Sequence, residues 1–70
     1  MDAIEIAKVQ NYLRTTFGSQ RIRVIAPKKA NAPVEVMVGE EFIGVLHKDV
    51  DEGETSYAFH MTILDIDLED

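Results

Sequence analysis

The spacing of apolar residues changes at Gly18, and this change constrains the fold more than any other feature of the sequence. Before Gly18, apolar residues recur at intervals of three and four, the pattern of one face of an amphipathic helix: Ile6, Val9, Leu13 and Phe17. Asp2 and Glu5 form a capping-box sequence ahead of this run, and Gly18 suits a left-handed C-cap behind it. We therefore predict a helix over Ala3–Phe17. Such a helix must bury its apolar face against another element, because it is too short to be stable alone.

Beyond Gly18 the apolar residues alternate with polar ones, which is the period of a half-buried strand. Turn residues divide this part of the chain into four predicted strands, over residues 21–26, 34–39, 42–48 and 56–67. A basic loop is expected at Pro27–Pro33 and an acidic loop at Asp49–Glu54. The sequence thus predicts a single α+β domain over residues 1–70. In it, one N-terminal helix packs on a four-stranded antiparallel β-meander (α-β-β-β-β).

Two turns set the predicted register, a two-residue turn at Gly39–Glu40 and a loop centred on Glu52. The register pairs Val36 with Ile43 and His47 with Tyr57. Because directly opposed residues share a face, one face becomes apolar and suits the helix. It holds Val34, Val36, Ile43, Val45, Tyr57, Phe59, Met61 and Ile63. The second face holds Glu35, Met37, Phe42, Gly44, Leu46, Ala58, His60, Thr62 and Leu64.

The second face is more apolar than a solvent-facing sheet surface should be. One helix covers one side of a sheet, and a 70-residue domain buries little surface by itself. We therefore predict that this face contacts a second copy of the chain, as a homodimer, or another protein. The predicted contact residues are Met37, Phe42, Gly44, Leu46, His60 and Leu64. Gly44 inside a strand indicates a bulge or a close backbone approach. A monomer with scattered surface apolar residues is the alternative.

The end of the predicted fourth strand changes phase. Tyr57, Phe59 and Met61 are apolar at odd positions, whereas Leu64 and Ile66 are apolar at even ones. A bulge or bend near residue 63 would keep both runs in the sheet. Alternatively, the chain leaves the sheet there and pairs with a partner.

Charge is distributed unevenly along the chain, whose formal net charge is −6. Residues 6–34 hold six basic side chains and no acidic one, whereas residues 35–70 hold eleven acidic side chains and one basic one. The two halves are expected to attract each other within one fold, or between copies. The basic residues Arg21, Arg23, Lys28 and Lys29 form a candidate patch for nucleic acid. Two observations make nucleic acid an improbable ligand: the pI is about 4.7, and no aromatic residues alternate with these bases.

The chain shows no motif for catalysis, a metal or another cofactor. The predicted register places His47 and His60, the two histidines, on opposite faces, so we expect no metal pair. The segment from Asp49 lacks the glycine and glutamate positions of a calcium loop. The sequence contains neither a nucleophile elbow nor a phosphate-binding glycine loop. A small enzyme or ligand-binding subunit with a site on the sheet is the alternative function, with His60, Thr62 and Glu35 as its candidate residues.

Two phrases carry a family resemblance, Gly-Glu-Glu-Phe-Ile-Gly-Val at residues 39–45 and Ile-Leu-Asp-Ile-Asp-Leu at residues 63–68. With the helix at Glu5–Phe17, they make the chain similar to a domain-of-unknown-function family of small alphaproteobacterial proteins. The resemblance covers nearly the whole chain. It implies a single-domain bacterial cytoplasmic protein and supplies no activity, cofactor or catalytic residue.

The residues themselves also predict a cytoplasmic location. The first residues lack the basic and apolar regions of a signal peptide, no apolar run is long enough for a membrane span, and cysteine is absent. The function predicted from the sequence is therefore a small, acidic, non-enzymatic protein–protein interaction module that self-associates through the second face of its sheet.

Overall fold

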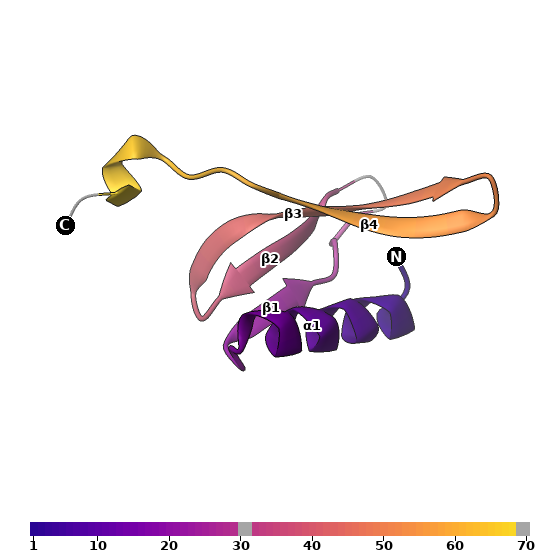
Figure 1. Ribbon diagram of the computed structural model, residues 1–70, viewed down its shortest axis with the longest axis horizontal. Coiled ribbons are helices and arrows are strands. Elements are labelled where there is room, and N and C mark those ends of the chain that lie inside the picture. Colours follow the sequence, from indigo (N-terminus) through magenta and orange to yellow (C-terminus); the bar gives the residue numbers. More distant parts are fainter. Residues whose placement is uncertain (30–31, 69–70) are drawn as a thin grey trace.

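The structure, a computed structural model, describes residues 1–29 and 32–68, and Figure 1 shows one helix followed by four strands. The elements are α1 (Ala3–Phe17), β1 (Ile22–Ile25), β2 (Val34–Val38), β3 (Glu41–Asp51), β4 (Glu54–Met61) and a short 3-10 helix, η1 (Asp65–Leu68). The strands form one antiparallel sheet in the order β1-β2-β3-β4. The predicted α+β class and meander are confirmed. Part of the predicted loop between β1 and β2, residues 30 and 31, lies outside the described residues.

Helix α1 begins and ends where the sequence indicates. The Asp2 side chain accepts a hydrogen bond from the Glu5 N–H (2.8 Å), and the Glu5 side chain accepts one from the Asp2 N–H (3.1 Å). This reciprocal pair is the predicted capping box. Gly18 follows the helix with φ 63°, the left-handed conformation that glycine adopts without a steric cost.

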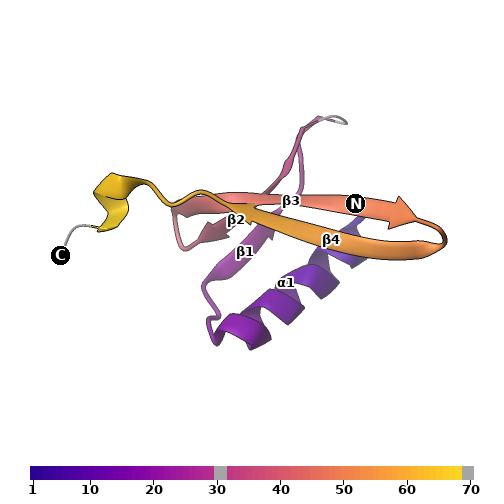
Figure 2. The same ribbon diagram turned by 45° about the horizontal axis from the view of Figure 1, so that its top comes forward.

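The first three members of the apolar stripe of α1 pack into or against the core. Leu13 is in the core, and Ile6 and Val9 are half-buried against it. Phe17, the last member, remains 59% exposed. The helix packs mainly on β1, at one edge of the sheet, so that its C-terminal end lies away from the core (Figures 1 and 2).

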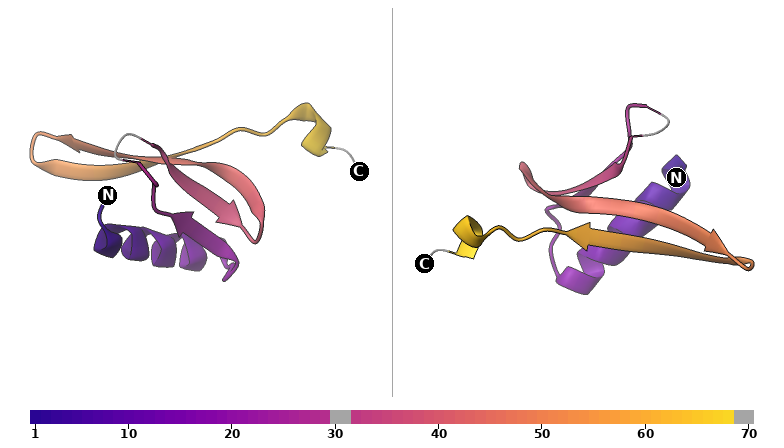
Figure 3. Two further views of the ribbon diagram at one scale, coloured as in Figure 1. Left: turned by 180° about the vertical axis from the view of Figure 1, so that it is seen from behind. Right: turned by 90° about the horizontal axis from the view of Figure 1, so that it is seen from above.

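Polar side chains of α1 also cover the outer edge of β1. Gln10 Oε1 accepts a hydrogen bond from the Val24 N–H (3.0 Å), and Arg14 Nε donates one to the Ile22 carbonyl oxygen (2.8 Å). Unpaired strand edges recruit other strands, so these bonds protect β1 from such pairing. At the other edge of the sheet, no segment of the described chain lies along the outer side of β4 (Figure 3).

Both tight hairpins have two-residue turns. Val38 pairs with Glu41 around Gly39–Glu40, as predicted, and Gly39 has φ 61° as the first residue of a II′ turn does. Asp51 pairs with Glu54, and the intervening Glu52 and Gly53 have φ of 51° and 79°, the pattern of a I′ turn. The acidic loop predicted over residues 49–54 was therefore wrong. Because Gly53 allows so tight a turn, both strands extend almost to the tip.

A β-bulge at Ile43 shifts the register of β3 by one residue. Met37 pairs with Phe42 and Val36 pairs with Gly44, so Ile43 has no partner on β2. The predicted pairing of Val36 with Ile43 was therefore wrong. A one-residue shift in pairing moves side chains to the opposite face of a sheet. Each residue of β3 just after the bulge therefore lies on the face opposite to the predicted one: Gly44, Val45 and Leu46. The predicted bulge or close approach at Gly44 is confirmed.

The core reflects this shift. It consists of Leu13, Ile22, Val24, Val34, Val36 and Leu46. Leu46 is 3% exposed and faces the helix, so its predicted place on the second face was wrong. Val45 instead lies on the second face. The apolar residues of β4 remain on the helix side as predicted, namely Tyr57, Phe59 and Met61. The pairing of β3 with β4 is also shifted by one residue relative to the prediction, so that Phe59 pairs with Leu46 and not with Val45.

Strand β4 ends earlier than predicted. Its last pair is Met61 with Gly44, and the next residue of β3 would be the bulged Ile43. The ladder therefore stops, and the chain leaves the sheet. In η1, the Asp67 N–H donates to the Leu64 carbonyl oxygen (2.9 Å), and the Asp67 carboxylate accepts a bond from the Leu64 N–H (3.3 Å). The prediction that the fourth strand extends to Asp67 was therefore wrong. The prediction that Ile63 belongs to the core was also wrong, because Ile63 is 61% exposed.

We expect Gly44→Ala to destabilise the fold by about 1–3 kcal/mol, the usual cost of overpacking. A Cβ atom at position 44 would overlap the His60 carbonyl oxygen and lie 2.7 Å from Phe59 Cε1. Urea unfolding measures the difference, with the exposed Ser56→Ala as the control, for which we expect a change within about 0.5 kcal/mol. An unchanged free energy of unfolding for Gly44→Ala would contradict the close approach of β3 and β4.

Candidate functional site

The sheet face that points away from α1, here called the open face, is the candidate interaction surface. Its apolar part comes from three strands. Met37 and Phe42 oppose each other on β2 and β3, and Val45 opposes His60 on β3 and β4. Phe42 is 54% exposed, whereas Met37 and Val45 are half-buried by their neighbours. The open face therefore presents one strongly exposed aromatic ring within a flatter apolar area.

Three of the six predicted contact residues lie on this face, namely Met37, Phe42 and His60. Leu46 and Gly44 do not present side chains there, because the bulge turns both positions toward the helix. Leu64 lies in the segment after β4 and is 57% exposed. No amphipathic pattern reveals a bulge, so the faces of β3 could not be assigned from alternation alone.

A shallow hollow of about 370 Å³ brings four of the predicted contact residues together. Its lining includes Phe42, Gly44, His60 and Leu64. The chain after β4 forms one wall, through Thr62, Leu64 and Asp67. Leaving the sheet at Met61 thus builds a concave site beside the open face, which a continuous fourth strand would not have done.

The two histidines are neighbours on the open face. The ring centroids of His47 and His60 are 5.3 Å apart, with the rings inclined at 71°. Their predicted location on opposite faces was wrong, because His47 pairs with Ala58 and not with Tyr57. No group of three or more His, Cys, Asp or Glu residues that could hold a metal ion occurs in residues 1–29 and 32–68.

The basic residues are spread along the molecule. Arg21 and Arg23 lie by the β2–β3 turn, where Arg23 Nη2 donates a hydrogen bond to the Gly39 carbonyl oxygen. Lys28 and Lys29 are exposed in the loop that follows the opposite end of β1. The structure therefore does not place the four residues in one patch.

A second concavity, which we call the helix-side groove, separates α1 from β4. It has a volume of about 500 Å³ and is lined by Lys8, Val9, Tyr12, Leu13, Thr16, Phe17, Leu46, Tyr57 and Phe59. The sequence did not predict this groove, because it predicts that α1 packs on the sheet but not over which strands the helix lies. The one available signal was Tyr12, a large residue outside the predicted stripe that is 67% exposed.

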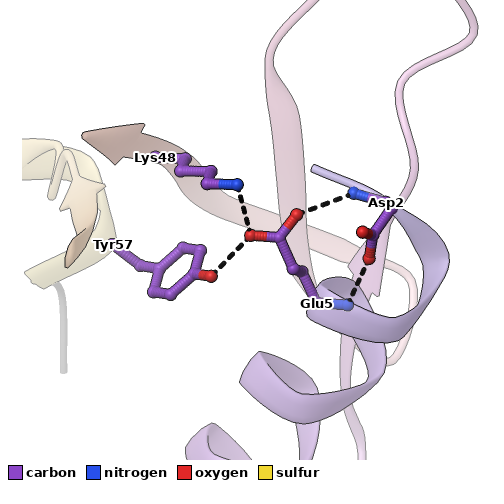
Figure 4. A network of polar contacts seen from close by, with 4 residues as sticks. All are labelled: Asp2, Glu5, Lys48 and Tyr57. Carbon is purple, nitrogen blue, oxygen red and sulfur yellow. Dashed lines mark hydrogen bonds and ion pairs between the residues drawn. The ribbon is translucent and has the colours of Figure 1, made fainter. Parts of the chain in front are cut away.

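A polar network includes Tyr57, one of the residues that line this groove, together with Asp2, Glu5 and Lys48 (Figure 4). Glu5 Oε2 lies 2.6 Å from Lys48 Nζ and accepts a hydrogen bond from the Tyr57 hydroxyl at 2.6 Å. These contacts join the first turn of α1 to both strands of the β3–β4 hairpin. The hydrogen bond from Lys48, followed by those from Tyr57 and the Asp2 N–H, lowers the pKa of the Glu5 carboxyl from 4.5 to about 2.

The basic and acidic halves of the sequence form few ion pairs with each other within one copy. In the described part of the chain, the one ion pair joins Glu5, an acid of the N-terminal half, to Lys48, the single base of the C-terminal half. No ion pair there joins the six basic residues of the N-terminal half to the acidic C-terminal half. The attraction expected between the two halves within one fold is therefore not seen as ion pairs in the described residues.

The Glu5 network predicts a pH dependence of stability. A carboxyl whose pKa is lowered by folding contributes stability above its ordinary pKa, and this contribution is lost as the pH falls. For Glu5 the loss should occur between about pH 4.5 and pH 2. Urea unfolding at pH 6 and pH 3 should show a larger decrease for the wild type than for Glu5→Gln.

Glu40→Gln is the control for this comparison, because Glu40 makes no hydrogen bond or ion pair with a described residue. It should keep the pH dependence of the wild type. An equal decrease in wild type and Glu5→Gln would show that the network does not anchor the hairpin in solution.

Comparison with known proteins adds one match. Residues 5–67 match the model of a family described as "Protein of unknown function (DUF3126)". This confirms the predicted resemblance to a domain-of-unknown-function family over nearly the whole chain. No curated protein and no solved structure matches the chain. In the described residues, no helix is long and apolar enough to cross a membrane.

Proposed function

The chain belongs to the DUF3126 family, and from its surfaces we propose that it is a non-enzymatic protein–protein interaction module that self-associates through the open face. We further propose that it acts in the bacterial cytoplasm, as the sequence suggests. The partner is a second copy of the chain or, at the same surface, another protein.

One observation carries this proposal: the chain exposes more large apolar side chains than it buries. Six apolar residues are buried in the described structure, whereas eleven large ones are exposed. A small domain with so little buried apolar surface has marginal stability. Association buries part of this exposed surface and stabilises the folded state by mass action.

The open face supports the proposed contact through shape and chemistry. Phe42 projects from it, and the hollow beside it is lined by Gly44, His60 and Leu64. In a contact related by two-fold symmetry, the same patch meets itself, so a projecting ring beside a hollow is self-complementary. Aromatic residues seated in a partner's pocket are the usual anchors of protein interfaces.

A second candidate function is the binding of a small ligand or substrate beside His60. The observation that favours it is the hollow itself, whose volume of about 370 Å³ falls within the range of small-molecule sites. The hollow offers His60, Thr62 and Asp67 as polar groups. Nucleic acid is a weaker possibility, because Arg21 and Arg23 lie at the other end of β1 from Lys28 and Lys29.

We expect Phe42→Asp to weaken self-association by about 2 kcal/mol or more, roughly 30-fold in the dissociation constant, as for an aromatic anchor. The carboxylate would have to be desolvated in the interface, and the ring would be lost. Sedimentation equilibrium over a range of concentrations should show a lower average mass for the variant than for the wild type.

Ile4→Asp is the matched control, because Ile4 is 68% exposed on α1, away from the open face. It should keep the wild-type mass. A wild-type protein that stays monomeric at high concentration would refute self-association. A monomer in which fragment-sized ligands shift the NMR signals of Phe42, His60 and Thr62 would instead support the ligand-binding alternative.

A further inference from the structure

The two outer strands of the sheet differ in how their edges are protected. The edge of β1 is covered by α1, through the bonds from Arg14 to Ile22 and from Val24 to Gln10. The edge of β4 has no such cover in the described chain, and it is eight residues long, against four for β1. Long uncovered edges pair with other strands unless charge, proline or a bulge prevents it.

The β3–β4 turn identifies which backbone groups of β4 point outward. In a two-residue hairpin the flanking pair, here Asp51 and Glu54, exchanges both hydrogen bonds, and such pairs then alternate along an antiparallel ladder. Ala58 and His60 therefore bond to β3. The residues whose N–H and C=O groups point away from β3 are Thr55, Tyr57, Phe59 and Met61, all of them uncharged.

The side chains of these outward residues also lie on the helix side, beside the helix-side groove. Tyr57 and Phe59 line the groove, and Met61 is 51% exposed next to them. Phe17, across the groove on α1, is 59% exposed. A strand added along the edge of β4 would therefore satisfy backbone groups and cover apolar side chains at the same time.

We propose that β4 pairs antiparallel with β4 of a second copy, in a register centred on Ala58. This register uses all four outward residues of each copy, because it opposes Tyr57 to Phe59 and Thr55 to Met61. Glu54 then faces Thr62, so no two like charges are directly opposed. The contact is distinct from the open face and joins two four-stranded sheets into one of eight strands.

The composition of the β4 edge favours a second copy as the occupant. The four outward residues lie symmetrically about Ala58, so antiparallel pairing opposes each of them to another uncharged residue of the same run. Two copies related by a two-fold axis therefore present matching edges to each other. Each acidic hairpin tip meets the end of the other copy that continues into Asp65 and Asp67 of η1, so the match rests on the backbone and the uncharged side chains and not on charge.

Edge pairing is compatible with the proposed open-face contact. An eight-stranded sheet keeps its two helices on one side and its open face on the other. Two such sheets packed through their open faces form a tetramer with two kinds of two-fold contact, a common closed symmetry. Loss of the face contact would leave the edge-paired dimer.

Cysteine cross-linking tests the edge contact, since the chain has no cysteine of its own. In the proposed register the two Ala58 residues form a pair without hydrogen bonds, whose Cα atoms lie about 4.5 Å apart. This separation allows a disulfide, which spans roughly 4.4–6.8 Å. We expect Ala58→Cys, in the Phe42→Asp background that removes the face contact, to give a covalent dimer under mild oxidation.

His47→Cys in the same background is the control. It lies on the same face but one strand inward, so two copies are separated by three strand spacings, about 14 Å, and should not cross-link. Backbone amide exchange of the cysteine-free protein provides a second readout. The N–H groups of Tyr57 and Phe59 should exchange at least tenfold more slowly at high than at low concentration. The Ala58 N–H, which bonds to β3, should change less.

The outcomes separate the two proposals. Cross-linking at position 58 and not at 47, with concentration-dependent protection of Tyr57 and Phe59, supports edge pairing. If the wild type associates, but the Ala58→Cys variant does not cross-link and Tyr57 and Phe59 of the wild type are not protected, edge pairing is overturned and the open-face proposal stands. A single monomeric mass at all concentrations overturns both.

Discussion

The bulge at Ile43 is the constraint on which the rest of the sheet depends. By inserting one unpaired residue into β3, it turns Leu46 into the core and brings Gly44 against the backbone of β4. It also removes the pairing partner that β4 would need beyond Met61, so the chain leaves the sheet there. The core, the hollow beside Phe42 and the exposed segment from Ile63 onward therefore share one local cause.

The position of α1 decides where apolar surface remains. Its capping box and Gly18 set its length, Gln10 and Arg14 attach it to the edge of β1, and Glu5 attaches its first turn to the hairpin. A helix held in this way protects one edge of the sheet and leaves the other edge bare. The helix-side groove lies between α1 and the strand that it does not cover.

Both proposals follow from the same imbalance between buried and exposed apolar side chains. A core of six residues is small for a chain of this length, and the exposed residues lie mostly on or near β4 and the segment that follows it. The open face offers a projecting ring beside a hollow, and the edge of β4 offers backbone groups beside a groove.

The sequence by itself determined the helix, the four strands, their order and both ends of α1. Periodicity, the Asp2–Glu5 capping box and the turn glycines are local signals, and each depends on residues a few positions apart. It also indicated correctly that one helix leaves apolar surface uncovered, and it placed Phe42 and His60 on the open face. Tertiary structure decided four other features: the face on which Leu46 lies, the proximity of the two histidines, the end of β4 and the helix-side groove. Each of these depends on how strands distant in sequence align, and a single unpaired residue changes that alignment without changing the alternation that a sequence displays.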